Sequence, residues 1–478
     1  MVPVSREIFA DLDTPLTVFA KIAGNEPFAF FFESLEGDEK WGRYSFIGLE
    51  PILTFKSSGT SITVSKDGKT EKLEGDPLRE LQKILESYRL PENSLSMPNF
   101  YGGAVGYLGY DMVRFMEDLP VVDKDPAELP DSFFIIPRLV LIFDNLRQAL
   151  TVVCCAEIDP EVKPAEMIYK AALNKIDYII GKLRNSTIPE ELLSSSNVVA
   201  NHIFSSSLEQ DYFKDMVEKA REYILAGDII QVVLSQRFHT QTDIPPLMLY
   251  RALRLINPSP YLFFLRMGDM VQIGSSPEIL VRLKDENVEV RPIAGTRPRG
   301  NTPDEDRKLE DELLADPKER AEHLMLVDLG RNDLGRVAEH GTVETHTLMV
   351  IERYSHVMHI VSGVRGRLDR GRDQFDVVRA CFPAGTVTGA PKIRAMEIIE
   401  ELEPQRRGPY AGAVGYFGFS GNMDLCITIR TFVMHGHRLW VQAGAGIVAD
   451  SDPEMEYQET LSKARGLRRA LELAEKGF

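Results

Sequence analysis

The alternation of apolar and polar positions predicts that the first part of the chain is built mainly from β-strands. Segments with the length and composition of strands occur at residues 28–34, 52–58, 61–67, 133–144 and 148–155. Among them lies one helical pattern, which Asp76-Pro77 begins as a cap followed by a proline in the first turn. The apolar positions of this helix recur at helical spacing, at Leu78, Leu81, Ile84 and Leu85.

A polar segment interrupts this pattern. Residues 183–207 are rich in Ser and Asn and weakly periodic, which is typical of a linker. A helix follows, which Ser207 and Gln210 are expected to cap and Gly227 to end. Its apolar stripe consists of Phe213, Met216, Val217, Ala220 and Ile224. Strands and helices alternate from there onward, so we predict two domains, residues 1–190 and residues 205–478.

Two glycine-rich segments resemble each other. Residues 101–111 (YGGAVGYLGYD) and 410–420 (YAGAVGYFGFS) share a Gly-x-Val-Gly-Tyr core. Charged residues surround the second copy but have no counterparts around the first. We therefore interpret the pair as two strands that pass close under another layer, or as an old duplication, rather than as two equivalent active sites.

Composition and charge exclude several classes of protein. A chain of 478 residues is too long for one ordinary core, which agrees with two domains or one large double-layered domain. Its net charge of −17 argues against a nucleic-acid surface and means that an anionic ligand must be captured locally by arginines or a metal ion. No apolar run approaches the ~20 residues of a membrane span and the N-terminus has no signal pattern, so we expect a cytoplasmic protein. The four cysteines have neither zinc spacing nor a disulfide framework, and we expect buried, reduced thiols.

Two predicted helices carry acidic residues on one face. In the first, which Asp316-Pro317 begins and Gly330 is expected to end, the face holds Glu319, Glu322, His323 and Leu326. In the second, which Asp452-Pro453 begins, it holds Glu456, Glu459 and Lys463. Such faces are often simply solvated, but Mg²⁺ is usually held by one or two carboxylates together with substrate and water. The spacing alone leaves both interpretations open.

Other motifs are informative mainly by what they exclude. Residues 382–404 enter a helix at Pro391 through a Gly/Thr turn, but they lack the Gly-Lys-Ser/Thr ending of a phosphate loop. No cysteine lies in a nucleophile turn, so this chain is not expected to hydrolyse an amide itself. Residues 288–300 (VEVRPIAGTRPRG) place small residues at a strand end among three arginines, which suggests a backbone that approaches an anion. His356 and His359 lie in a strand-like segment, and at most one of them is expected to line a site.

Seven segments together resemble the chorismate-utilising enzymes, and among these the large subunits of anthranilate synthases. They are SPEILVRL (276–283), RPIAGTRPRG (291–300), AEHLMLVDLGRNDLGRV (321–337), YSHVMHIVSG (354–363), GTVTGAPK (385–392), RRGPYAGAVGYFG (406–418) and QAGAGIVADSDPEMEYQET (442–460). The resemblance implies an α+β fold, an α/β sandwich of two orthogonally packed, mostly antiparallel sheets flanked by helices. It also implies that residues 1–190 carry a tryptophan-regulatory segment and that residues 205–478 form the chorismate-binding catalytic domain.

The implied reaction converts chorismate and ammonia to anthranilate and pyruvate, the first committed step of tryptophan biosynthesis. By resemblance, Glu322 and Glu459 are the Mg²⁺ ligands and Glu278 is the acid that protonates the departing hydroxyl. His359 is the base of pyruvate elimination, and Thr386 is a positioning hydroxyl. The implied substrate contacts are Gly295, Thr296, Tyr410, Arg430, Gly444, Ala445 and Gly446, with Arg430 on the pyruvyl carboxylate.

The N-terminal segment 31–48 and the segment NPSPYLFF (257–264) resemble the tryptophan pocket of the family. The matching positions are Ser34, Asn257, Pro260, Tyr261 and Leu262. In anthranilate synthases this pocket serves feedback inhibition, whereas relatives that make aminodeoxychorismate can hold tryptophan as a structural part.

Two positions separate the expected activity from sibling reactions. Relatives that add water to chorismate carry a lysine base where this chain has Gln231, which cannot deprotonate water. Relatives that make 4-amino-4-deoxychorismate commonly carry a lysine where this chain has Ala294, although some also have alanine. Aminodeoxychorismate synthase and 2-amino-2-deoxyisochorismate synthase are kept as alternative functions.

The resemblance also implies a partner. Because this chain lacks a glutaminase nucleophile, ammonia is expected to come from a separate glutamine amidotransferase subunit. A non-catalytic tryptophan-sensing subunit on the same fold is the alternative that is not an enzyme. That alternative is disfavoured because Glu278, Glu322, His359 and Glu459 are all present.

Overall fold

Two long strands form the centre of the molecule. A computed structural model describes residues 1–35, 42–90, 98, 100–122, 124, 129–158, 164–192, 204–354 and 357–478. Strands β3 (Tyr44–Ser58) and β7 (Ser132–Asp144) pair along most of their length, with a register shift between Pro51 and Leu53. On one side of this shift β3 pairs with β2 and β7 with β8, and on the other side β3 pairs with β4 and β7 with β6. Two layers of sheet therefore diverge from one shared pair of strands.

The first layer is completed by strands from both ends of the chain. Besides the shared strands it contains β1 (Val2–Phe9), β8 (Ala149–Ala156), β2 (Phe28–Glu33), β11 (Tyr261–Met267), β12 (Met270–Ser276), β21 (Thr431–His435), β22 (Arg438–Ile447) and β10 (Gln231–Gln241), with the short β9 (Ser205–Ser206) and β18 (Gly389–Ala390) paired to β10.

The second layer is extended at one edge by three further strands. Besides the shared strands, the layer contains β5 (Lys69–Glu74), β4 (Ser61–Lys66), β6 (Gly103–Leu108), β19 (Ala413–Gly418), β20 (Met423–Ile427), β13 (Ile279–Lys284) and β14 (Asn287–Val290). The extension consists of β17 (Val357–Arg367), which pairs with β14, and of β15 (Ile293–Pro298) and β16 (Glu344–Arg353), which pair with β17. All of these pairings are antiparallel.

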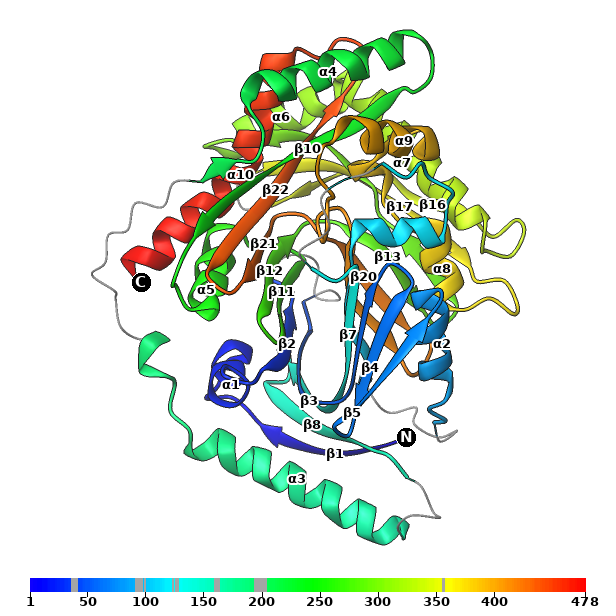
Figure 1. Cartoon of the computed structure of the whole chain (residues 1–478). Helices are drawn as coiled ribbons and strands as arrows, with labels where there is room; N and C mark the ends of the chain where they lie inside the picture. The colour runs from blue at the N-terminus through cyan, green and yellow to red at the C-terminus, as the bar shows by residue number, and fades with distance from the viewer. Residues whose placement is uncertain are drawn as a thin grey trace.

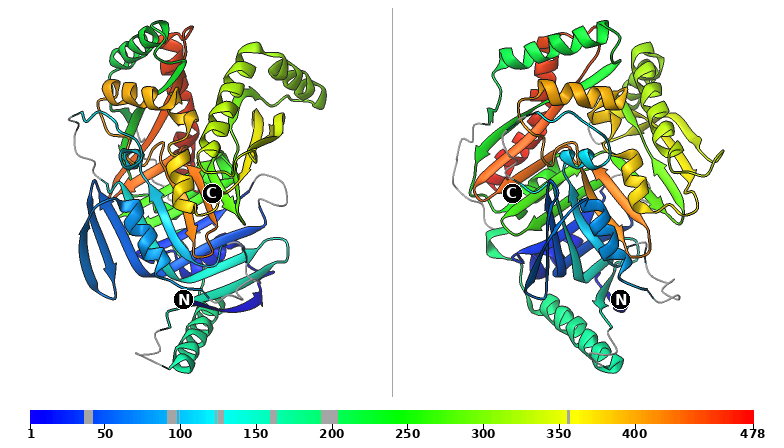
Figure 2. Two further views of the ribbon diagram at one scale, coloured as in Figure 1. Left: turned by 90° about the vertical axis from the view of Figure 1, so that its right-hand side faces the viewer. Right: turned by 45° about the vertical axis from the view of Figure 1, so that its right-hand side comes forward.

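Helices cover the outer faces of the layers (Figures 1 and 2). The outer face of the first layer packs against α1 (Pro15–Ile22), α3 (Ala165–Asn185), α5 (Pro246–Ile256) and α10 (Pro453–Lys476). The outer face of the second layer packs against α2 (Pro77–Glu86) and α8 (Gln374–Cys381), whereas α4 (Gln210–Leu225) and α9 (Lys392–Leu402) pack against β10 of the first layer. Helices α6 (Pro303–Ala315) and α7 (Pro317–Gly335) lie on β15 and β17, and 3-10 turns occur at η1 (Tyr110–Phe115), η2 (Glu190–Leu192) and η3 (Gly385–Val387).

The space between the layers is filled by aromatic side chains. Phe30, Phe100, Tyr107, Phe133 and Phe263 are buried there together with aliphatic residues of both layers. Rings of this size each remove a large apolar area from water, which stabilises the packing of one layer on the other. The α+β sandwich expected from the sequence is confirmed.

Several local expectations are also confirmed. Asp76 caps α2 by accepting hydrogen bonds from the amides of Leu78 and Arg79. All four cysteines are free and buried. No helix among the described residues is long and apolar enough to cross a membrane.

Other local expectations are wrong at helix ends. Residues 183–185 belong to α3, which buries Leu183, while residues 193–203 of the expected linker lie outside the described residues. Ser207 does not cap α4, because its amide is bonded to the carbonyl of Arg237 and Glu209 holds the N-cap position. Helix α7 continues through Gly330, where an added Cβ would lie 3.0 Å from the Val290 side chain. This glycine allows close packing on β14 rather than ending the helix.

The two glycine-rich segments are neighbouring strands of the same layer. β6 and β19 pair directly, with Gly106 opposite Gly415. An added Cβ would lie 1.9 Å from the Phe133 carbonyl oxygen at Gly106 and 2.0 Å from the Asp424 carbonyl oxygen at Gly415. Close backbone contacts therefore account for the shared small residues. The pairing of β6 with β19, like that of β2 with β11, joins residues 1–190 to residues 205–478, and the division into two domains stays a prediction.

Candidate active site

A cavity of about 660 Å³ lies between α7 and α10 and against strands β10, β15, β17 and β22. These two helices stand apart in the left view of Figure 2, with α7 in yellow-green and α10 in red. The cavity brings together most of the residues expected from the sequence, namely Glu278, Gly295, Thr296, Glu322, His359, Thr386, Tyr410, Arg430, Gly444, Gly446 and Glu459. Ala445 does not line it, because its side chain points into the hydrophobic core.

One wall of the cavity is acidic. Asp316 caps α7 and Asp452 caps α10, and each of these residues is followed by a proline. Each helix also presents two carboxylates three residues apart to the cavity. These are Glu319 and Glu322 on α7 and Glu456 and Glu459 on α10. Lys463 Nζ lies 2.6 Å from Glu459 Oε1 and donates to the Gly444 carbonyl at 2.9 Å. The side chains of two distant segments thus form one anionic surface.

The electrostatics of this wall fit a divalent cation. Burial raises the pKa of Glu322, and the charges of Glu319 and Glu459 raise it further, whereas Gln231 and Lys463 lower it. Within the described residues, no group of three or more His, Cys, Asp or Glu side chains is placed to hold a metal ion by itself. Mg²⁺ commonly takes only one or two protein carboxylates and completes its shell with substrate and water. Glu322 and Glu459 together provide a pair of carboxylates of the kind that Mg²⁺ binds in this way.

Arg430 supplies a buried positive charge to the same cavity. Burial lowers the pKa of its guanidinium, and Nη1 donates to the Lys463 carbonyl at 2.5 Å. Among the residues that the structure describes, no carboxylate lies within ion-pair distance of it. A buried charge without a partner is costly, so this position favours an anionic ligand group.

Glu278 is a carboxyl group held in an apolar setting between β12 and β13. Ser276 fixes the turn, because its hydroxyl donates to the Ile427 carbonyl at 2.7 Å and accepts from the Glu278 amide at 3.4 Å. Burial raises the pKa of Glu278 to about 8, and the nearby Thr386 hydroxyl and Ile293 amide offset only part of this rise. At neutral pH the group therefore holds a proton that it can donate.

In contrast to the protonated Glu278, His359 on β17 is placed to accept a proton. Its Nδ1 lies 3.0 Å from the Gly295 carbonyl oxygen and 3.0 Å from Thr296 Oγ1. Because a carbonyl only accepts, Nδ1 carries the proton and Nε2 is left as the acceptor. Burial lowers the pKa of His359, the charge of Arg430 lowers it further, and the bond to Gly295 raises it. The ring is thus a neutral base at physiological pH.

Glycines bring the backbone to the cavity surface. Gly295 sits at a register shift between β15 and β17 with φ +67°, a conformation that favours glycine. An added Cβ would lie 2.7 Å from the Tyr410 hydroxyl at Gly444 and 2.6 Å from Gln231 Nε2 at Gly446. Burial raises the pKa of Tyr410 to about 12, so its hydroxyl stays protonated beside Gly444.

The three arginines around Gly295 take no part in the cavity. Arg291 pairs with Glu352, Arg297 with Asp316 and Glu319, and Arg299 with Asp306. Glu319, Glu456 and Lys463, which the helical spacing places on the same faces as Glu322 and Glu459, also line the cavity. Lys318 lines it as well but was not predicted, although its position four residues before Glu322 is a signal that could have found it.

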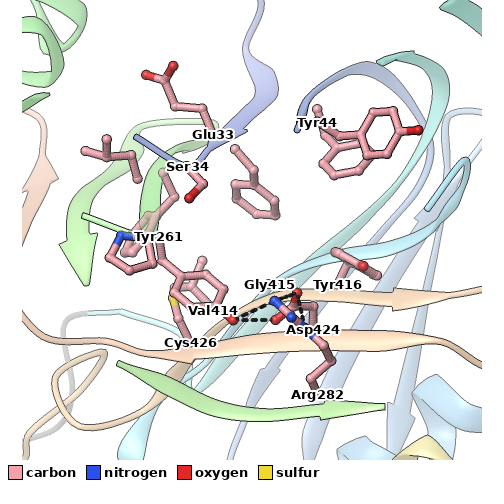
Figure 3. A pocket seen from close by; sticks show the side chains of 15 residues that line it. Glu33, Ser34, Tyr44, Tyr261, Arg282, Val414, Gly415, Tyr416, Asp424 and Cys426 are labelled. Carbon is pink, nitrogen blue, oxygen red and sulfur yellow. Dashed lines mark hydrogen bonds and ion pairs between the residues drawn. The ribbon is translucent and has the colours of Figure 1, made fainter. Parts of the chain in front are cut away.

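A second, smaller cavity of about 90 Å³ lies between the two layers (Figure 3). Ser34, Pro260, Tyr261 and Leu262 line it, and the Tyr261 hydroxyl donates to Asp424 at 2.9 Å. Asn257 does not line it. Its side-chain amide donates instead to the hydroxyl of Ser275 at 3.2 Å. Residues 36–41 of the expected pocket segment lie outside the described residues.

Comparison with known proteins identifies the family. The family model for chorismate binding enzymes matches residues 30–469. The chain belongs to the chorismate-binding enzymes. Anthranilate synthase component 1 of Synechocystis sp. is 48% identical over 98% of this chain and 96% of its own length. The component 1 protein of Aquifex aeolicus is 48% identical over 99% of this chain and 95% of its own length.

Solved structures of chorismate-binding enzymes agree with the fold. The crystal structure of anthranilate synthase component I from Streptococcus pneumoniae has a TM-score of 0.80 at 37% identity, over 96% of this chain and 98% of that chain. The menaquinone-specific isochorismate synthase of Escherichia coli has a TM-score of 0.74 at 21% identity, over 98% of this chain and 94% of that chain. The second likeness shows a shared fold only.

Proposed function

We propose that this protein is the large subunit of an anthranilate synthase, which converts chorismate and ammonia to anthranilate and pyruvate at the start of tryptophan biosynthesis. The observation that carries the proposal is the charge pattern of one cavity. A carboxylate pair, an arginine without a carboxylate partner, a protonated acid and a neutral histidine all line it. Component 1 relatives at 46–48% identity support the same reaction.

Substrate binding uses both charged parts of the cavity. Chorismate carries two carboxylates, and Arg430 is placed to take the pyruvyl carboxylate in a guanidinium–carboxylate fork. Glu322 and Glu459 would hold Mg²⁺, whose positive charge would neutralise the ring carboxylate. The open backbone at Gly295, Gly444 and Gly446 lets the ring lie close to the strands. Thr296 and Tyr410 complete the contacts with their hydroxyl groups.

The first step needs an acid. Ammonia forms a bond to C2, both ring double bonds shift along the ring (C1=C2 to C1=C6, and C5=C6 to C4=C5), and the C4–O bond breaks. Glu278 donates its proton to the departing hydroxyl, which leaves as water. The Thr386 hydroxyl lies near the Glu278 carboxyl group and is proposed to orient it. The product of this step is 2-amino-2-deoxyisochorismate.

The second step needs a base. His359 removes the proton at C2, and the electron pair makes the ring aromatic while the enolpyruvyl C–O bond breaks. The enolpyruvyl group takes up a proton and leaves as pyruvate. Because Nδ1 is bonded to the Gly295 carbonyl, Nε2 is the nitrogen that receives the proton.

Two cavity residues favour ammonia as the nucleophile. Ala294 offers no amine that could attack C2 in its place, and Gln231 is too weak a base to activate water. Free ammonia is proposed to come from a glutamine amidotransferase subunit, since the relatives are named component 1 and the four cysteines of this chain are buried outside the cavity. The smaller cavity of Figure 3 is proposed to bind L-tryptophan as an inhibitor.

The direct test uses the purified chain alone. Chorismate, Mg²⁺ and ammonium at alkaline pH should yield blue-fluorescent anthranilate without a partner subunit. Glu322→Gln should abolish this product, whereas Asp328→Asn, an exposed carboxylate on the same helix, should leave it unchanged. A stable amino-chorismate without anthranilate would contradict the proposal.

A further inference from the structure

A buried ion pair lies directly behind the cavity wall. The side chains of Arg407 and Glu403 are 1% and 4% exposed, and they follow α9 at a spacing of four residues. Arg407 Nε donates to Glu403 Oε2 at 2.9 Å, and Nη2 donates to Oε1 at 2.7 Å. The carboxylate and the guanidinium therefore fix each other in a two-bond fork.

The remaining donors of Arg407 bond to backbone atoms of the cavity wall. Nη1 donates to the Val387 carbonyl at 2.8 Å and Nη2 donates to the Val233 carbonyl at 2.7 Å. Val387 and Val233 both line the cavity, and Val387 directly follows Thr386. One side chain thus holds strand β10 and turn η3 at a set separation.

Glu403 extends the same network to another wall residue. Its Oε1 accepts from the Ser235 amide at 2.8 Å and from the Ser235 hydroxyl at 2.9 Å. Gln442, which lines the cavity, donates to that hydroxyl at 2.9 Å. The ion pair therefore contacts the cavity wall through both of its members.

The guanidinium also lies between two tyrosine rings. Its central carbon is 4.7 Å from the ring centroid of Tyr110 and 5.6 Å from that of Tyr410. Such a contact restricts where a ring can lie, because the cation is attracted to the face of the ring. The Tyr410 hydroxyl projects from this ring toward Gly444 in the cavity.

From this arrangement we propose that Arg407 is a positioning residue of the reaction, which sets the place of the Tyr410 hydroxyl and of the Thr386–Val387 turn without touching the substrate. The inference rests on the proposed function, since it assigns a task to a group behind that site. Lysine cannot substitute for arginine here. Its single ammonium cannot lie flat on a ring while bonding two carbonyls and both oxygens of Glu403.

The test is a double-mutant cycle on anthranilate formation with ammonium as nitrogen source. Arg407→Lys should lower kcat/KM by about 30-fold, within the usual coupling of residues in contact. In a Tyr410→Phe background the same change should lower it by less than about 3-fold, because the hydroxyl to be positioned is already absent. Arg406→Lys is the matched control, since the bonds to Glu403, Val233 and Val387 are made by Arg407 and not by the neighbouring Arg406 side chain, and it should leave kcat/KM unchanged.

The cycle separates positioning from general scaffolding. Equal fold-losses for Arg407→Lys in both backgrounds, in proteins with unchanged thermal unfolding, would overturn the proposal. If Arg407→Lys does not fold, Glu403→Gln replaces it, because this change keeps the shape of the site but weakens the fork, and the same non-additivity is expected.

The wild-type assay separates this inference from the proposed function. A wild-type chain that forms a different chorismate product overturns the function but not the positioning role, and the cycle is then measured on that product. A wild-type chain that turns over no chorismate overturns both.

Discussion

At the scale of single residues, burial determines the chemistry that each group can perform. Glu278 and His359 line the same cavity, but burial keeps the carboxyl protonated and the imidazole neutral. One can thereby act as an acid and the other as a base at the same pH, as the two proton transfers of the proposed mechanism require. Arg430 keeps its charge despite burial and provides the site for an anionic group.

The raised pKa of Glu278 predicts how stability depends on pH. Between the ordinary value of 4.5 and the folded value of about 8, the native state holds a proton that the unfolded state has released. Unfolding then becomes easier as pH rises through this window, because the unfolded state binds fewer protons. Glu278→Gln removes this contribution. The melting temperature of the variant relative to wild type should therefore be higher at pH 9 than at pH 5 when both are measured by circular dichroism. A difference that does not change with pH would contradict the assigned burial.

At the scale of secondary-structure elements, irregular strand pairing shapes the site. The register shift between β15 and β17 leaves Gly295 unpaired in a left-handed conformation, with its carbonyl bonded to His359 and its Cα beside Glu319. An added Cβ at Gly295 would lie 3.1 Å from Glu319 Oε2 and from Leu313 Cδ1. The element therefore needs glycine for both its backbone angle and its contacts.

A pair of matched substitutions separates these two needs. Gly295→Ala and Gly268→Ala impose nearly the same strain, with φ +67° and φ +69°, but Gly268 has no atom within 4 Å of an added Cβ. The strained backbone alone should cost both variants about 1 kcal/mol of stability in urea unfolding. Only Gly295→Ala should raise KM for chorismate, by about tenfold if the lost binding energy is near 1.4 kcal/mol. An equal KM for the two variants would show that the bulge does not shape the substrate site.

At the scale of the whole molecule, the smaller and the larger cavity are distinct. The smaller cavity lies between the layers (Figure 3), and the larger one lies between α7 and α10. A short chain of hydrogen bonds connects their surroundings. Asn257 donates to the Ser275 hydroxyl, and the Ser275 amide donates to the Arg430 carbonyl at 3.2 Å. The Asn257–Leu262 segment is therefore linked through Ser275 to the backbone of Arg430.

Occupancy of the smaller cavity can be tested by filling it. L-tryptophan should inhibit anthranilate formation by the wild type. Ser34→Phe should abolish the inhibition, because Ser34 lines this cavity and a ring added there would occupy its space. Ser61→Phe, at an exposed strand end, should remain as sensitive as wild type. Inhibition that persists in Ser34→Phe, measured by anthranilate fluorescence, would place tryptophan elsewhere.

The sequence by itself determined features that depend on neighbouring residues. The Asp-Pro pairs at 76, 316 and 452 each begin a helix, and the spacing of Glu319 with Glu322 and of Glu456 with Glu459 placed these pairs on one face. Capping and helical periodicity act within a few residues, so they can be read directly from the chain. The family segments located most of the residues that the structure brings to the cavity.

Only the tertiary structure decided which distant segments meet. It shows that β3 and β7 are shared by both layers, that the two glycine-rich segments pair with each other, and that Arg407 holds Tyr410 from behind the cavity wall. It also decided that Gly330 continues a helix and that Asn257 bonds Ser275 rather than lining the smaller cavity. These outcomes depend on burial and on contacts between residues far apart in the chain. Local periodicity sets neither burial nor such contacts, because both depend on which segments pack against a residue once the layers have formed.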